Sequence, residues 1–353
     1  MMLAYQHYYS DLAFSYLMPD PLASPAYPTI FTPSSGASLY GRIVKEKLLD
    51  IDHKAATIQT CFRIKDGVEK GGDGVHLSLY RLAIAHSLNA ETRKLSMQKW
   101  LYFLIEKLEL DRKRLHVTFC NGGQFLGTEI PADDEAIDFW KSEKIQTEKI
   151  TSGPWEDNFQ NTKFEPFCGP TTELFYERDD KLVEIGIHIN FAYLKSKIEN
   201  EISIVAHNRN VFSCGFGIER LEYVLNDYQM IQECEDINPL IEYIAGKCKV
   251  HSMQSEQKKH IAKLADQIRG LTLISSEGAM LGHRGRQDVF RKHVLDTLLQ
   301  AKLLGLYSKI FMEELIDLSI RLCENRFPGT VIVRQKVLST LEQSQHYFGE
   351  KMS

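Results

Sequence analysis

Hydrophobic and polar positions follow two different patterns along this chain. Before about residue 236 the apolar runs are short and separated by polar loops, a pattern typical of strands mixed with a few helices. After Asn238 apolar residues recur at spacings of three and four, as at Ile261, Leu264 and Ile268, which is the period of an amphipathic helix. The change of pattern predicts a domain boundary near Glu235 to Pro239, with one domain over residues 1–236 and an α-helical domain over residues 237–353.

Individual elements of the first part can be predicted from their spacing. The runs TIQTCFRI and VHLSLYRLAI look like two antiparallel strands joined by the long Gly-bearing loop KDGVEKGGDG. The first 45 residues are rich in Pro, Tyr and Ser, a composition that suits an irregular arm over a domain surface. The remaining predictions are a helix over 90–108, the strand RLHVTFC, a helix near 133–144, the strands TTELFYE and LVEIGIHINF, and a strand running directly into a helix in NVFSCGFGIERLEYVLND.

Length and composition indicate an ordinary intracellular globular protein. The chain has 353 residues, long enough for two domains, because single hydrophobic cores usually stop growing at about 250–300 residues. It has no apolar run near the roughly 20 residues that cross a bilayer and no basic start before an apolar core, so we expect a cytoplasmic protein without a membrane partner. The seven cysteines are scattered and never form a C-x-x-C pair, so we expect neither a disulfide framework nor a zinc knuckle.

The charge distribution leaves one stretch open to two interpretations. A formal net charge of −5 argues against a general nucleic-acid binder. From Gln257 to Leu303, however, nine Lys or Arg stand against four Asp or Glu, a local balance of +5. This stretch is either a solvated helical face or a surface that meets a polyanion.

Two segments are candidates for binding phosphate. In CGFGIERL a strand turns into a helix at Gly215 and Gly217, and Arg220 lies one turn into that helix. Helix N-termini favour anions, but Gly pairs before helices are also common packing devices. Arg63 precedes the Gly-rich loop and could hold a phosphate oxygen, or it could be a surface arginine paired with Asp66 or Glu69.

Two carboxylates lie where a charge needs a partner. Glu173 and Glu184 are on predicted strands inside otherwise apolar runs, so each must find a cation, a metal or hydrogen-bond donors. Metal ligation and an ordinary ion pair are both open from the residues alone.

The order of these pieces resembles that of class II aminoacyl-tRNA synthetases of the alanyl type. TCFRIKD is similar to the family's motif 2 strand, and GFGIERL is close to motif 3. NFQNTKFEPFCGPTTELFYE is similar to the Gly-Pro segment, and KLADQIRGLTLISSEGAMLGHRGRQDVFRK to the start of the helical tRNA-recognition domain. The resemblance implies an α+β fold, namely an antiparallel sheet flanked by helices and followed by an α-helical domain.

The resemblance also implies residue roles. It places Arg63 on the ATP α-phosphate, Arg220 on the far phosphates, and Mg²⁺ at Glu173 or a neighbouring carboxylate. These three residues are the expected catalytic set, and a carboxylate substrate needs no general base because it is already ionised. The expected nucleotide site further contains His76, Leu82, Glu184, Gly215 and Gly217.

The amino-acid pocket departs from the family's pattern. Gln160 stands where the family has Trp, Gly186 and Ile187 stand where it has Trp-Asn, and Ser213 replaces its Asp. The lost Asn and Asp hold the substrate's ammonium group in that family, and losing them typically costs a few kcal/mol when the group is desolvated. Arg81 replaces a Glu and would reverse the charge near the nucleotide.

These departures lead to three hypotheses. The first is a stand-alone paralogue that activates a different small amino or carboxylic acid and passes it to tRNA or to another nucleophile, such as a carrier-protein thiol or an amine. The second is an alanine–tRNA ligase without editing; the chain ends before the family's editing and C-terminal domains, and His283 replaces an acceptor-stem Asn. The third is a non-catalytic regulator that binds tRNA or nucleotide, against which the two retained arginines argue. Class II enzymes often dimerise, so a homodimer is an expectation of the resemblance.

Overall fold

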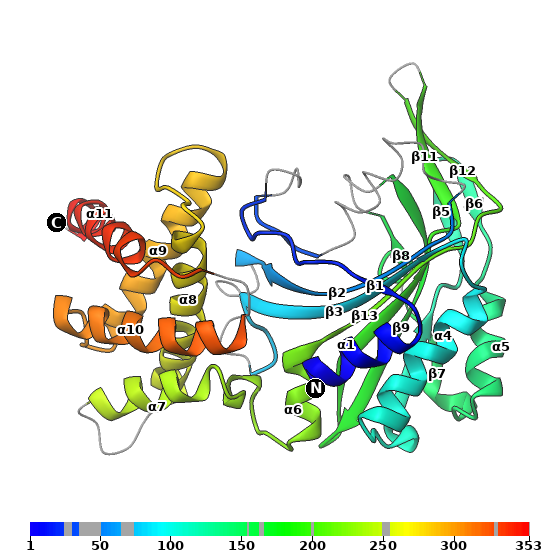
Figure 1. Cartoon of the computed structure of the whole chain (residues 1–353), viewed down its shortest axis with the longest axis horizontal. Helices are drawn as coiled ribbons and strands as arrows, with labels where there is room; N and C mark the ends of the chain where they lie inside the picture. Colours follow the sequence, from blue (N-terminus) through cyan, green and yellow to red (C-terminus); the bar gives the residue numbers. More distant parts are fainter. Residues whose placement is uncertain are drawn as a thin grey trace. The chain divides into compact units, whose positions relative to one another are not determined.

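The computed structural model divides the chain into two compact units (Figure 1). The first comprises Met1–Pro19, Ser34–Gln59 and Leu82–Leu225, and the second Asp20–Pro33, Thr60–Arg81 and Asn226–Ser353. The predicted helical domain lies within the second unit, which also contains two early segments; the predicted division after residue 236 stays a prediction. The residues that the structure describes are 1–24, 30–34, 51–64, 74–153, 155–161, 166–198, 201–248, 255–327 and 331–352.

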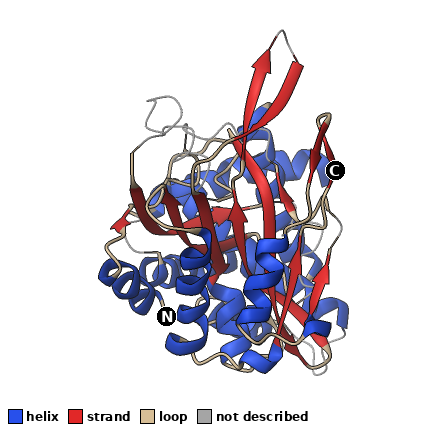
Figure 2. Ribbon diagram, turned by 90° about the vertical axis from the view of Figure 1, so that its right-hand side faces the viewer, coloured by secondary structure: helices blue, strands red, loops and turns tan. Residues whose placement is uncertain are grey.

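A mainly antiparallel sheet is present, as predicted, and most of its strands belong to the first unit, with the end of β2 and the start of β3 assigned to the second (Figure 2). The strand order is β1-β2-β3-β13-β10-β9-β11-β12, with β4 and β8 also pairing with β9 and β7 pairing with β4. The pairs β1–β2 and β4–β7 are parallel. The strands are β1 (Ser15–Tyr16), β2 (His53–Phe62), β3 (Leu79–Leu88), β4 (Leu115–Phe119), β7 (Ile150–Ser152), β8 (Phe159–Gln160), β9 (Phe167–Arg178), β10 (Lys181–Asn190), β11 (Tyr193–Ile198), β12 (Glu201–Ala206) and β13 (Val211–Gly217), beside a separate hairpin of β5 (Gly123–Phe125) and β6 (Thr128–Ile130).

The two faces of this sheet differ in what covers them. Side chains of successive strand residues point to opposite faces, and residues paired across strands share a face. On one face Trp140 donates to Thr172 at 2.8 Å, and His188 lies 3.1 Å from Ser96, so helices cover this side. Along β9 the residues of the other parity, beginning with Glu173, are only half-buried. The helices of this unit are α1 (Met2–Asp11), α4 (Arg93–Tyr102) with its π-helical extension η1 (Phe103–Lys107), α5 (Asp134–Ser142) and α6 (Ile218–Leu225), with the short 3-10 turns η2 (Arg112–Arg114) and η3 (Thr147–Lys149).

The irregular arm predicted for the first 45 residues is wrong at its start. Residues 2–11 form helix α1, on which Tyr5 and Tyr9 are fully buried. Their rings lie one turn apart with centroids at 4.6 Å, and Tyr5 also packs edge-on against Phe103 and Phe216. Tertiary burial of aromatic side chains therefore sets the helix where composition indicated a loop.

A later part of the arm is irregular, as predicted, and is tied to the helices of the second unit. Glu277 accepts the backbone N–H groups of Leu22 and Ala23 at 2.9 and 2.8 Å. Arg286 donates to the carbonyl oxygens of Ala23 and Ser24 at 2.8 and 3.1 Å. Charged side chains thus satisfy backbone groups that no secondary structure pairs.

The second unit is helical after residue 237, which confirms the predicted α-helical region. Its long helix α8 is buried along most of its length, including Leu264, Ile268 and Leu271 at 0% exposure. None of the described helices is both long and apolar enough to cross a membrane. The helices are α7 (Asn238–Lys247), α8 (Ser255–Ser276), α9 (Gly285–Leu303), α10 (Lys309–Arg326) and α11 (Arg334–Met352), preceded by the 3-10 turn η4 (Ile231–Glu233).

One buried ion pair holds helices α4 and α5 of the first unit together. The guanidinium of Arg93 binds Asp133 through two parallel bonds of 2.5 and 2.6 Å, and both side chains are nearly fully buried. The same carboxylate caps helix α5 by accepting from the N–H of Ala136. Because both charges are desolvated, removing one leaves the other without compensation.

We expect Asp133→Ala to lower the free energy of unfolding by about 3–5 kcal/mol, since it leaves a buried guanidinium unpaired and removes a helix cap. Urea denaturation followed by circular dichroism measures this. Glu135→Gln is the matched control, because Glu135 contacts the same Arg93 at 3.3 Å but its side chain is 59% exposed. A loss below about 1 kcal/mol in Asp133→Ala would show that the pair is not a major stabilising contact.

Candidate functional site

The segment that precedes Arg220 folds as predicted, with a strand passing directly into a helix. Strand β13 ends at Gly217 and helix α6 begins at Ile218. A Cβ atom added at Gly215 would meet the carbonyl oxygen of Ala83 at 3.2 Å, so this position is tight. A Cβ atom at Gly217 would lie 3.6–3.7 Å from the aliphatic part of the Arg220 side chain, an ordinary van der Waals contact, so space does not require the glycine at this position.

Arg220 is oriented by Glu184. Its Nη1 donates to the carboxylate of Glu184 at 2.7 Å and to the backbone carbonyl of the same residue at 3.0 Å. The ion pair that the sequence left open for Glu184 is present. A guanidinium carries five N–H donors in a fixed plane, so the bonds to one residue leave it able to hold phosphate oxygens as well.

A one-residue bulge in β10 brings Glu184 to this position. The pairing with β9 is regular from Ile187↔Glu173 to Gly186↔Leu174, shifts at the bulge, and resumes at Glu184↔Phe175. Since Phe175 has the same parity as Glu173, Glu184 shares the face of Glu173.

Most candidate residues of the first unit lie on that same face. Direct pairing places Glu173, Ile187 and Gly215 in one row across β9, β10 and β13. The neighbouring row of the same parity contains Ser213, opposite Ile189. Leu82 pairs with Gly217 and Gln160 pairs with Gly169, which puts both on this face too. We call this side of the sheet the open face.

Electrostatics set Glu173 apart within the open face. Burial raises the pKa of Glu173 to about 7, and the negative charges of Glu184 and Asp157 act in the same direction, whereas Arg220 opposes them. The surroundings therefore hold more negative charge than Arg220 balances. A perturbed carboxyl group in such a place is typical of a site that receives a cation or a proton.

The carboxylates of the open face fit a magnesium ion only if other ligands complete its shell. Within the described ranges no group of three or more His, Cys, Asp or Glu side chains is arranged to hold a metal. Mg²⁺ commonly binds through one or two carboxylates together with water and substrate phosphates, and Glu173 suits that pattern.

The predicted acid pocket is neutral where its residues lie on the open face. Ser213 is 6% exposed and pairs with His86, whose pKa burial lowers to about 3, so both are uncharged at neutral pH. Ile187 adds an apolar side chain beside Glu173. These residues supply no counter-charge of their own for an ammonium group.

Gly186 is not part of that pocket surface. It lies on the helix-covered face, where a Cβ atom would meet the Gly215 carbonyl at 2.7 Å and the Trp100 ring at 2.8 Å. Close packing against helix α4 explains the glycine, and residue 186 presents nothing to the open face.

Arg63 belongs to the second unit, whereas Arg220 belongs to the first. Arg63 is exposed, its guanidinium lies 5.4 Å from the Tyr80 ring centroid, and it donates to the carbonyl of Pro33 at 3.2 Å. The alternative partners Asp66 and Glu69 lie outside the described residues. His76, half-buried, is also in the second unit, so the convergence of Arg63 and His76 with Arg220 stays a prediction.

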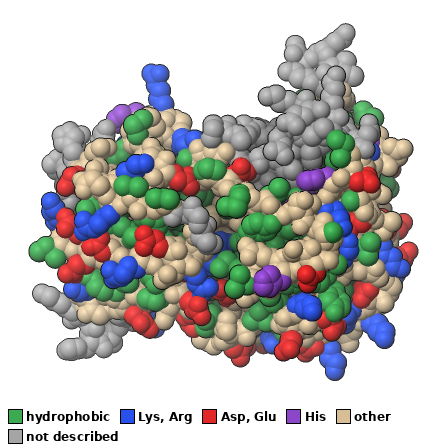
Figure 3. Space-filling model, viewed as in Figure 1, with side chains coloured by type: hydrophobic (Ala, Val, Ile, Leu, Met, Phe, Trp, Pro, Cys, Tyr) green, Lys and Arg blue, Asp and Glu red, His purple; other side chains and the backbone are tan. Residues whose placement is uncertain are grey.

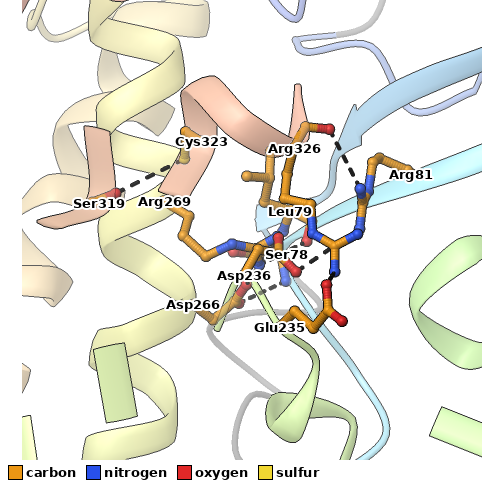
Figure 4. Close-up of polar contacts among 10 residues, drawn as sticks. All are labelled: Ser78, Leu79, Arg81, Glu235, Asp236, Asp266, Arg269, Ser319, Cys323 and Arg326. Atoms are coloured by element: carbon orange, nitrogen blue, oxygen red, sulfur yellow. Dashed lines mark hydrogen bonds and ion pairs between the residues drawn. The ribbon is translucent and has the colours of Figure 1, made fainter. Parts of the chain in front are cut away.

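Arg81 does not act as predicted. It is 1% exposed, lies 3.8 Å from Asp236, donates to the carbonyl of Arg326 and packs over the Phe327 ring (Figure 4). Its charge is committed to a buried cluster of the second unit and is not presented to a ligand.

The surface of the helical unit does not show the basic stretch as a single patch. On the face seen in Figure 3, Lys and Arg side chains are interspersed with Asp and Glu. Several of the nine basic residues are held by local acids, as in Lys292 with Asp288 at 2.7 Å. His283 is exposed and lies within this stretch, between helices α8 and α9.

Sequence reasoning missed Asp157 and Tyr80. Asp157 lies in the polar loop before β8, and its negative charge raises the pKa of Glu173. The signal available in the sequence was the pair of acidic residues in WEDNF. The Tyr80 ring lies next to the Arg63 guanidinium because strands β2 and β3 are neighbours in the sheet. The alternating sequence pattern predicts that these two strands pair, but it predicts their register only approximately.

Comparison with known proteins identifies the family. Residues 4–353 match the family model of tRNA synthetases class II (A). Alanine–tRNA ligase of Wolbachia pipientis wMel is 25% identical over 260 residues, which cover 71% of this chain and 28% of the relative. That of Natranaerobius thermophilus is 24% identical over 315 residues, which cover 84% of this chain and 34% of the relative. The chain therefore spans about a third of the length of these relatives.

A solved structure similar to this chain is the apo form of S. aureus histidyl-tRNA synthetase, with a TM-score of 0.41, 9% identity, and coverage of 74% of this chain and 81% of that one. The match to the family model runs along essentially the whole sequence and includes the strand-to-helix turn at Arg220 and the strand that bears Glu173. The chain belongs to the class II tRNA synthetases of the alanyl type.

Proposed function

We propose that this chain uses ATP to activate a small amino or carboxylic acid as its acyl-adenylate and then transfers the acyl group to an acceptor. The observation that carries the proposal is the pairing of Arg220 with Glu184 on the same open face as the proton-binding carboxyl of Glu173. A fixed guanidinium beside clustered carboxylates is suited to a magnesium-bound polyphosphate.

The chemistry needs charge neutralisation more than proton transfer. A carboxylate oxygen of the acid bonds to the α-phosphorus, the bond to the bridging oxygen of the β-phosphate breaks, and pyrophosphate leaves. Arg63 is assigned to the α-phosphate and Arg220 to the leaving phosphates, where fixed positive charge stabilises the transition state. Magnesium, bound with Glu173, would supply further neutralisation of the phosphate oxygens.

The neutral pocket supports an altered substrate. Ile187 and Ser213 offer no carboxylate to an α-ammonium group, which favours a different acid over alanine. The acceptor is then a tRNA hydroxyl or another nucleophile, such as a carrier-protein thiol or an amine, whose attack on the acyl carbon releases AMP. An alanine–tRNA ligase is the second candidate, favoured by the names of the curated relatives.

Pyrophosphate exchange into ATP, measured across a panel of amino and carboxylic acids, tests the proposal. We expect pyrophosphate exchange with at least one acid. Arg63→Ala and Arg220→Ala should each lower the exchange rate by about 30- to 1,000-fold, since each removes about 2–4 kcal/mol of transition-state stabilisation. Arg112→Ala is the matched control, because Arg112 also pairs with a glutamate, Glu143 at 3.0 Å, away from the open face.

The outcomes separate the candidates. Exchange that responds to alanine alone would favour the alanine–tRNA ligase. ATP binding without exchange for any acid would favour a non-catalytic regulator. Full exchange in either arginine variant would refute that residue's phosphate assignment.

Glu173→Gln should make the protein more stable at pH 8 and less active. The folded state holds the Glu173 proton more tightly, with a pKa of about 7 against an ordinary 4.5. The stability it contributes is present below pH 4.5 and is lost as pH rises through 7. After discounting for solvent screening, we expect Gln to stabilise by about 1–2 kcal/mol at pH 8 and not at pH 4, with exchange strongly reduced at both ends.

Glu177→Gln on the same strand is the control with the opposite sign. Hydrogen bonds from His116 and Lys149 lower the pKa of Glu177 to about 2, so neutralising it removes favourable contacts. Thermal unfolding from pH 4 to pH 8 measures both variants. If the difference in stability between Glu173→Gln and the wild type stayed constant with pH, the raised pKa of Glu173 would be contradicted.

Ser213→Asp should restore binding of an α-ammonium group. The substitution adds a carboxylate in the row next to Glu173, and Ser213→Asn adds similar bulk without charge. We expect exchange with alanine to rise at least about tenfold in the Asp variant over the Asn variant, corresponding to roughly 1.4 kcal/mol. Equal rates in the two variants would show that Ser213 does not line the acid pocket.

A further inference from the structure

A buried carboxylate of helix α8, that of Asp266, binds the start of strand β3, which lies beside the residue that follows β2, Arg63 (Figure 4). Asp266 on this helix accepts the backbone N–H of Ser78 at 2.7 Å and that of Leu79 at 3.4 Å. Asp266 is 3% exposed and Ser78 is fully buried. All of these residues belong to the second unit.

The contact continues to Arg63 by one more hydrogen bond. The N–H of Arg63 donates to the carbonyl oxygen of Ser78 at 2.9 Å. Ser78 is thus bonded on its N–H side to the helix and on its carbonyl side to Arg63. Two hydrogen bonds connect the carboxylate of Asp266 to the backbone from which the Arg63 side chain extends.

The surrounding cluster fixes Asp266 itself. Arg269, one turn further along α8, donates to the carboxylate of Asp266 and to the carbonyl of Leu79 at 3.4 and 3.3 Å. Arg269 also binds Asp236, which lies 3.8 Å from Arg81. Two arginines and two aspartates therefore balance in a site where each is at most 3% exposed. Such a cluster is rigid because breaking any pair leaves a buried charge without a partner.

The two ends of Arg63 are held differently. Its backbone is paired with buried Ser78, whereas its guanidinium is exposed beside the Tyr80 ring and the Pro33 carbonyl. The reach of a long side chain depends on where its backbone starts, and a displacement of about 1 Å at a reacting group can cost up to about 100-fold in rate.

We infer that Asp266 is a positioning residue for Arg63, fixing its backbone so that the guanidinium meets the α-phosphate. This inference rests on the proposed adenylation. It makes a residue of the helical region necessary for the efficiency of the first step, in which no acceptor takes part.

The test combines an exchange assay with hydrogen exchange on the full chain. Asp266→Asn keeps the size of the side chain but loses its charge and one accepting oxygen, and Asp266→Glu keeps the charge but displaces it. We expect each to lower kcat/KM for ATP in pyrophosphate exchange by about 10- to 100-fold per active site, with KM raised as well as kcat lowered. Both should also accelerate amide hydrogen exchange at Ser78 and Leu79. Asp296→Asn is the matched control, because Asp296 of helix α9 accepts from Gln267, the neighbour of Asp266 on α8, and from Gln300.

A double-mutant cycle with Arg63→Ala distinguishes positioning from general destabilisation. If Asp266 acts through Arg63, adding Asp266→Glu to Arg63→Ala should change kcat/KM by less than about twofold. The same fold-loss in both backgrounds, or unchanged amide exchange at Ser78, would overturn the inference. Wild-type protein without any ATP-dependent exchange would instead refute the proposed function, while the amide exchange would still decide whether Asp266 holds Ser78.

Discussion

The two-residue period of the β-strands is the constraint on which the candidate site depends. Because one parity of β9, β10 and β13 packs under helices, the other parity points to the opposite side of the sheet, where Glu173, Ile187 and Gly215 share one row. His188 contacts Ser96 through Nε2, Thr172 accepts from Trp140, and the burial of these side chains under the helices favours this register. The positions of Glu173 and Ser213 on the open face follow from that register and need no separate explanation.

Charge is distributed unequally between this face and the buried cluster of the second unit. In the cluster, burial alone would raise the pKa of Asp236, but the positive charges of Arg269 and Arg81 outweigh it and lower that pKa. At Glu173 the single nearby Arg220 is insufficient, and the pKa is raised. The charge of Asp236 is compensated within the chain, whereas a bound cation would stabilise the ionised form of Glu173. Burial also raises the pKa of Asp266 in the same cluster, so the contrast is between Asp236, which has a structural role, and the half-buried Glu173, which is the candidate for function.

Features that depend on nearby residues could be predicted from the sequence, whereas contacts between distant residues could not. The turn from Gly217 into the helix of Arg220, the strand of Glu173 and the helical second half follow from patterns within a few residues, and the structure confirms them. Arg81 could not be placed, because its partner Asp236 lies far along the chain and no local pattern links them. Helix α1 was missed for the same reason, since the partners that bury Tyr5 are Phe103 and Phe216.

The bulge in β10 has a consequence for how this family of sequences can change. With strict alternation from Ile187, the side chain of Glu184 would point toward the helices. The extra residue at position 185 places Glu184 opposite Phe175 instead, on the open face. Deleting Ile185 would therefore remove the bulge without moving Glu184 to the other face, because Glu184 and Gly186 would then be consecutive residues opposite Phe175 and Leu174. A related sequence that lacks this residue could keep the Glu184–Arg220 pair in an unbulged strand, so an alignment gap at position 185 still pairs residues from the same side of the sheet.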